Sequence, residues 1–85
     1  MRPLSVARPI EEWRVDAAYQ FASRHAPELY AKVVADVREE MRMGGTWQRL
    51  IVRWIEAKMF PTDWEWFVVS CLAQRAADEV SAEFN

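Results

Sequence analysis

The longest helical pattern in the chain spans residues 60–84 and reads FPTDWEWFVVSCLAQRAADEVSAEF. Thr62 and Glu65 have the spacing of a capping box, in which each side chain accepts a hydrogen bond from the other residue's backbone N–H. Pro61 precedes this cap, and neither Gly nor Pro follows it. We therefore predict one long helix that starts at Thr62. Its first half is apolar almost all round, so it needs cover on more than one face.

Length and composition indicate one small domain. The chain has 85 residues, of which 52% are apolar and five are tryptophan. A domain of this size buries only roughly 60% of the surface of its unfolded chain. The tryptophans offset this, because each can bury on the order of 150–250 Å². We predict an all-α fold, a compact four-helix domain over residues 9–85 with the long C-terminal helix at its centre, preceded by a flexible arm over residues 1–8.

Three further helices are predicted from apolar residues that recur at three- and four-residue spacing. The first covers residues 10–24 and must stop before Pro27, because proline disfavours helical geometry in the residue before it. Pro27 then begins the second helix, which ends at the glycine pair 44–45, with the first glycine in the left-handed conformation. Thr46 is the predicted N-cap of the third helix, which closes before Pro61.

Charge and hydropathy favour a cytoplasmic protein with no membrane contact. The longest uncharged run in the body of the chain, Trp66 to Gln74, is far shorter than the ~20 residues that a bilayer span needs. The first nine residues lack the apolar segment and cleavage site of a secretory signal. Nine arginines against two lysines, with twelve alanines, are typical of a GC-rich bacterial or phage genome.

The sequence contains no recognisable arrangement of catalytic residues. His25 is the only histidine, so a structural zinc site is not predicted, and a structural or solvated role is favoured at its place near a helix C-terminus. Cys71 is the only cysteine and lies among apolar residues, where we expect a buried, inert thiol with a raised pKa. We predict no catalytic residues, no metal ligands and no cofactor, and therefore a protein that is not an enzyme.

The glycine-containing turn before Thr46 has the layout of a helix-turn-helix. On that interpretation, residues 46–58 form a recognition helix whose outer face carries Thr46, Gln48, Arg49 and Arg53. Residues 46–62 carry three basic side chains and one acidic side chain (3 − 1 = +2). The whole chain has a net charge of −2, however, and Glu56 interrupts the basic face. An ordinary helical hairpin is therefore favoured, and DNA binding is kept as the alternative function.

The tryptophans suggest a protein-binding surface. Trp13, Trp54 and Trp64 lie within apolar stripes, so we predict them in the core. Trp47 follows two glycines at a helix start, and Trp66 lies on the opposite side of its helix from Trp64. We predict these two residues at a partner surface, because aromatic residues are enriched at protein interfaces.

One face of the last helix also has the residue spacing of a helix-pairing seam, a stripe of apolar residues that packs against a second helix. Its residues recur at spacings of three, four, three and four: Trp66, Val69, Ala73, Ala76 and Val80. We expect too few elements to cover this face, and an uncovered apolar stripe marks an interaction site. The prediction is a symmetric homodimer through the seam. The predicted function is a non-catalytic protein-binding module, a small adaptor or inhibitor that masks a partner's surface and also self-associates.

Overall fold

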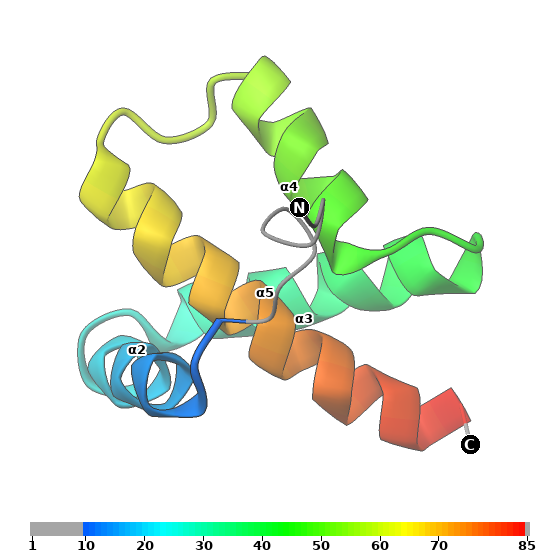
Figure 1. Ribbon diagram of the computed structural model, residues 1–85, viewed down its shortest axis with the longest axis horizontal. Helices are drawn as coiled ribbons and strands as arrows, with labels where there is room; N and C mark the ends of the chain where they lie inside the picture. The colour runs from blue at the N-terminus through cyan, green and yellow to red at the C-terminus, as the bar shows by residue number, and fades with distance from the viewer. Residues whose placement is uncertain (1–9, 85) are drawn as a thin grey trace, which may run out of the picture.

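The computed structural model describes residues 10–84, which contain four helices (Figure 1). They are α2 (Glu12–His25), α3 (Pro27–Arg42), α4 (Trp47–Glu56) and α5 (Asp63–Phe84). Residues 10–84 contain no β-strand, so the predicted all-α class with a long C-terminal helix is confirmed. The predicted arm over residues 1–8 lies outside the described part of the chain. None of the described helices is long and apolar enough to cross a bilayer.

Helix α2 begins at Glu12, two residues later than the predicted start at Ile10. Ile10 is tied to α5 instead. Its N–H donates to Oε1 of Gln74 at 2.7 Å, and its carbonyl oxygen accepts from Nε2 of Gln74 at 3.0 Å. These two hydrogen bonds hold the Ile10 backbone against α5, and the first turn of α2 closes on the carbonyl oxygen of Glu11, which accepts from the N–H groups of Arg14 and Val15. At the other end, α2 stops at His25 and Pro27 is the first residue of α3, as predicted.

The connection between α3 and α4 follows the predicted turn chemistry. Gly44 has φ +87°, the left-handed conformation that favours glycine after a helix end. Oγ1 of Thr46 accepts from the backbone N–H of Arg49 at 3.3 Å, which confirms Thr46 as the N-cap of α4.

The capping box at the start of α5 is also confirmed. The Glu65 N–H donates to Oγ1 of Thr62 at 3.2 Å, and the Thr62 N–H donates to Oε1 of Glu65 at 3.3 Å. Two N–H groups that have no partner within the helix are thereby satisfied. Helix α5 then continues for 22 residues.

Helix α5 contacts each of the other three helices, as α3 does, and it is the central element because it supplies half of the buried core residues (Figure 1). Its most extensive interface is with α3. One contiguous core results from these contacts, and eight of its residues come from α5. The buried core residues are Val15, Ala18, Ala22, Val33, Val37, Leu50, Ile51, Trp54, Val68, Val69, Cys71, Leu72, Ala73, Ala76, Ala77 and Val80.

Candidate functional site

The predicted dimer seam on α5 is buried inside a single chain. Val69 is 1% exposed, and Ala73, Ala76 and Val80 are 0% exposed. The small alanine side chains allow a neighbouring helix to approach closely, because the distance between helix axes depends on the side chains at the contact. The prediction of an uncovered stripe is therefore wrong, and these four residues belong to the core of the domain.

The two tryptophans that were predicted at a partner surface are half-buried. Trp47 and Trp66 both pack against the core. The indole Nε1 of Trp66 donates to the carbonyl oxygen of Phe60 at 3.0 Å, and the Phe60 and Trp66 rings meet edge to face at 5.1 Å between centroids. Trp66 thus fixes the α4–α5 connection onto α5. Because the Trp66 ring makes these contacts within the domain, it offers little free surface to a partner.

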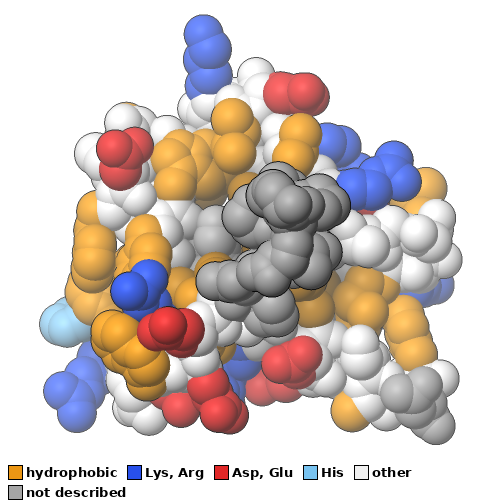
Figure 2. All heavy atoms as spheres, viewed as in Figure 1, with side chains coloured by type: hydrophobic (Ala, Val, Ile, Leu, Met, Phe, Trp, Pro, Cys, Tyr) orange, Lys and Arg blue, Asp and Glu red, His pale blue; other side chains and the backbone are white. Residues whose placement is uncertain are grey.

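The exposed aromatic surface lies elsewhere, on α2 and the first turns of α5. Phe21, Trp64 and Phe67 are 41%, 60% and 38% exposed, respectively. The Phe21 and Trp64 rings are perpendicular with centroids 6.1 Å apart, and the Trp64 and Phe67 rings stack with centroids 5.8 Å apart. We call these three residues the aromatic patch. Figure 2 shows hydrophobic side chains gathered over this side of the molecule, where α2 meets the start of α5.

The sequence prediction placed Trp64 in the core, which is wrong. The spacing of residues gave no signal of this exposure: Cys71 follows Trp64 by seven residues, about two helical turns, so the two share a face of α5, yet Cys71 is 0% exposed.

A pocket of about 110 Å³ adjoins the aromatic patch. Its lining comes from α2, α3, α5 and the loop before α5, so its shape depends on the whole fold. The lining residues are Phe21, Leu29, Phe60, Trp64, Glu65, Val68 and Val69. Glu65 is the only charged residue among them.

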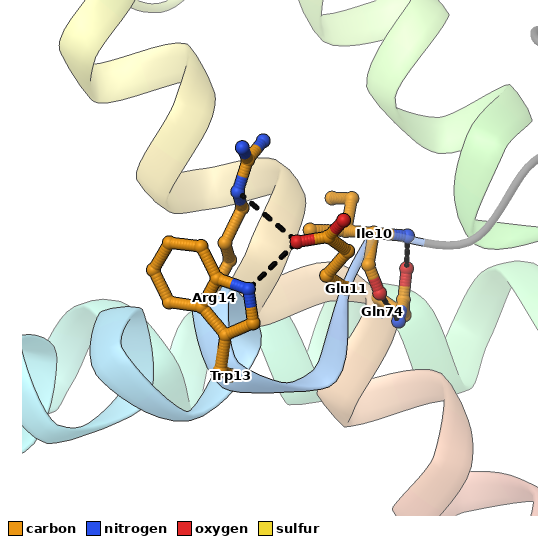
Figure 3. Close-up of polar contacts among 5 residues, drawn as sticks. All are labelled: Ile10, Glu11, Trp13, Arg14 and Gln74. Atoms are coloured by element: carbon orange, nitrogen blue, oxygen red, sulfur yellow. Dashed lines mark hydrogen bonds and ion pairs between the residues drawn. The ribbon is translucent and has the colours of Figure 1, made fainter.

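Trp13, also predicted in the core, is 64% exposed at the start of α2. Its indole Nε1 donates to Oε1 of Glu11 at 2.6 Å, and the Arg14 guanidinium lies 5.2 Å from the centre of its ring (Figure 3). Glu11 and Arg14 also form an ion pair at 3.8 Å. Polar neighbours on both sides hold this ring at the surface.

The predicted recognition helix carries both signs of charge. Arg49 is exposed, whereas Arg53 donates from Nη1 to Oε1 of the buried Glu40 on α3. Gln48 is half-buried, and the hydroxyl of Thr46 serves as the helix cap. The hollow between α3 and α4 is acidic on its α3 side, where Asp36, Glu39 and Glu40 line it. The four residues of the predicted DNA-binding face therefore do not form a uniformly basic surface.

The two side chains most often found in catalytic or metal sites, those of His25 and Cys71, differ in exposure. His25 is exposed, with its ring 4.8 Å from that of Phe21. Cys71 is fully buried, and burial raises the pKa of its thiol, as predicted. Residues 10–84 hold no group of three His, Cys, Asp or Glu side chains placed to bind a metal ion.

A polar cluster joins α2, α3 and α5. The Arg75 guanidinium lies 3.7 Å from the centre of the Tyr19 ring and pairs with Asp16 at 3.6 Å and with Glu79 at 3.7 Å. Burial raises the pKa of the Tyr30 hydroxyl above its ordinary value, and the nearby Glu79 carboxylate adds to the shift. These contacts link three helices, so we assign the cluster to the stability of the fold.

Comparison with known proteins finds no matching family model, no matching curated protein and no matching solved structure. Among the described surfaces, the aromatic patch with its pocket is the one that combines exposed aromatic rings with a concave shape.

Proposed function

We propose that this protein is a non-catalytic protein-binding module, a small adaptor or inhibitor whose aromatic patch covers a surface of a partner protein. The observation that supports this most directly is the contact of three exposed aromatic rings from two helices, Phe21, Trp64 and Phe67. Tryptophan is among the residue types that contribute most to binding energy at interfaces. An exposed apolar patch beside a pocket is also where interaction sites are found.

The size of the patch indicates its place in such an interface. A fully covered aromatic side chain buries on the order of 150–250 Å², so three rings that are 38–60% exposed offer roughly 200–350 Å². A stable interface buries about 800 Å² on each partner. The patch therefore supplies the energetic centre of an interface, and the surrounding polar residues supply its rim.

The test is retention of partner proteins from an extract of the native source. The immobilised wild type is compared with a variant that carries Trp64→Ala and Phe67→Ala. A matched control carries Val52→Ala and Ile55→Ala, which remove two apolar side chains of α4 that are 52% exposed and do not line the pocket. Circular dichroism establishes that all three are folded. We expect the wild type and the control to retain the same protein and the patch variant to lose it. Equal retention by all three would overturn the proposal.

Self-association is part of the same proposal, through the aromatic patch and not through the buried seam on α5. Sedimentation of the wild type and of the Trp64→Ala, Phe67→Ala variant measures it directly. A dimer that becomes a monomer in the variant supports homotypic binding, and a wild type that is monomeric at all concentrations would overturn self-association.

The alternative of DNA binding through α4 has less support, because Arg53 is engaged by Glu40 and acidic side chains lie beside it. Fluorescence polarisation with a generic duplex at low salt distinguishes the two functions. Binding that weakens steeply with added salt would favour the DNA-binding alternative.

A further inference from the structure

The aromatic patch carries opposite charges at its two ends. At the α2 end, Arg24 and His25 are exposed and line a hollow together with Phe21. At the α5 end, the exposed Asp63 directly precedes Trp64 and is the first residue of the helix. Figure 1 shows α2 and the first turn of α5 apart from each other on the same side of the molecule. The patch therefore lies between a basic end and an acidic end.

The charges at these two ends form no ion pairs within the described part of the chain. Among residues 10–84, no salt bridge includes Arg24, His25 or Asp63. The other carboxylate at the acidic end, that of Glu65, is used by the capping box with Thr62. Several other arginines do pair with carboxylates of their own domain: Arg14, Arg38, Arg53 and Arg75. The guanidinium of Arg24 and the carboxylate of Asp63 can thus serve a partner.

The aromatic rings alone are too small for a stable interface. They offer roughly 200–350 Å², whereas a stable interface buries about 800 Å² on each partner. The residues around the rings must therefore also contact the partner, and at two places these residues are charged. A fitting partner surface has an apolar centre, a negative group that faces Arg24 and a positive group that faces Asp63.

The protein's own patch has this pattern. In a symmetric dimer, the same surface of both chains meets itself. If the two-fold axis crosses the line from Arg24 to Asp63 at a right angle, the basic end of each copy faces the acidic end of the other. If the axis runs along that line, each end faces its own copy, and contacts between like charges disfavour this arrangement. The charges thus select one orientation of the axis.

We propose that the aromatic patch binds a second copy of this chain in a symmetric dimer, in which Arg24 of each copy faces Asp63 of the other. The aromatic rings of the two copies cover each other at the centre. The dimer contains two equivalent charged contacts, one on each side of the axis. The inference rests on the proposed protein-binding function and names the partner and its orientation.

Two charge reversals, Arg24→Glu and Asp63→Lys, test the arrangement by sedimentation. Each turns both charged contacts of the dimer into contacts between like charges. We expect each to raise the dissociation constant of the dimer at least about tenfold, because repulsion replaces attraction at two places. The matched controls are Arg49→Glu and Glu56→Lys, which change the net charge equally at exposed residues of α4 and should leave the dimer unchanged.

A mixture of the two reversal variants tests the orientation directly. In a mixed dimer, the introduced glutamate of one chain faces the introduced lysine of the other, and the second contact joins an unchanged Arg24 to an unchanged Asp63. Both contacts are attractive again, so the equimolar mixture is expected to dimerise about as well as the wild type. Circular dichroism establishes that each variant is folded. If a reversal prevents folding, the neutral Arg24→Gln or Asp63→Asn replaces it and should weaken the dimer to a smaller extent.

Three results would overturn the proposal: a wild type that is monomeric at all concentrations, a dimer that neither reversal weakens, or a mixture that stays monomeric. The retention experiment with the Trp64→Ala, Phe67→Ala variant reads a separate outcome. If the wild type is monomeric but retains another protein that this variant loses, the protein-binding function stands and the second copy is excluded as the partner.

Discussion

The Arg53 guanidinium on α4 donates to the Glu40 carboxylate on α3, and the two side chains differ greatly in exposure. The Glu40 side chain is 6% exposed, whereas that of Arg53 is 61% exposed. The Arg53 side chain therefore lies over the buried Glu40 carboxylate where α3 and α4 meet. A buried carboxylate is tolerated when it is paired and hydrogen-bonded. Burial of Glu40 thus depends on Arg53.

Arg53→Ala is expected to destabilise the domain by about 1–3 kcal/mol, because it leaves the Glu40 carboxylate without its partner. Arg49→Ala is the matched control, since Arg49 is an exposed arginine on the same helix and its loss should change stability by no more than about 0.5 kcal/mol. Urea denaturation of both variants measures the difference. Equal midpoints would show that the pair contributes nothing.

Gly45→Ala is expected to destabilise the protein through the same carboxylate. A Cβ atom at Gly45 would overlap the Glu40 carboxylate, so Glu40 would have to leave its place beside Arg53. We expect a loss of about 1–3 kcal/mol, the usual range when overpacking forces a buried side chain to move. In a Glu40→Ala background, the same substitution should cost much less. A double-mutant cycle of denaturation free energies tests this, and strict additivity would rule out the clash.

Ala76→Arg is expected to unfold the protein, because Ala76 is 0% exposed and an arginine there would bring both excess volume and an unpaired charge into the core. The loss should exceed about 4 kcal/mol, the range that single substitutions reach only through such mechanisms. Ala82→Arg on the same helix is the control, because Ala82 is exposed. Circular dichroism separates the two outcomes. A folded monomeric Ala76→Arg variant of a dimeric wild type would instead place the seam at an interface.

Arg38→Ala is expected to raise the pKa of Glu83 toward its ordinary value. In the wild type, Arg38 donates two hydrogen bonds to the Glu83 carboxylate, at 2.9 and 2.8 Å, and these hold the pKa of Glu83 below its ordinary value. A group whose pKa is lowered by folding adds stability above its unfolded-state pKa, and that stability is lost as pH falls through the folded-state pKa. Both residues are at the surface, so the contribution is small. An NMR titration of the Glu83 carboxyl carbon measures the shift, and identical curves in the two proteins would contradict it.

Most helix boundaries could be predicted from the sequence because each depends on neighbours within a few residues. Thr62 with Glu65, Thr46, Gly44 and Pro27 all act locally, through a cap, a left-handed residue or a missing N–H. Such contacts depend on the order of neighbouring residues and need no partner from a distant part of the chain. There are two exceptions. The start of α2 differs because Ile10 is held by Gln74, a residue 64 positions away. The third helix, predicted over residues 46–58, ends at Glu56, and Lys58 in the turn after it has φ +55°.

The place of the candidate site could not be predicted from the sequence. The abundance of aromatic residues indicated a protein-binding surface, but the sequence assigned Trp64 to the core and the alanine seam to the exterior. In the structure the assignments are reversed. Periodicity could not choose between these faces, because the first half of α5 is apolar almost all round and has no unique inward side.

By itself, the sequence determined the all-α class, the long final helix and its caps, because helical periodicity and capping depend on residues within one or two turns. Only the tertiary structure decided which face of α5 is buried, because that choice depends on how closely other helices can approach. Ala73 and Ala76 permit a close approach on one face, whereas Trp64 and Phe67 would hold neighbouring backbones apart on the other. The face with the small residues is the one that lies inside. The aromatic rings are left at the surface.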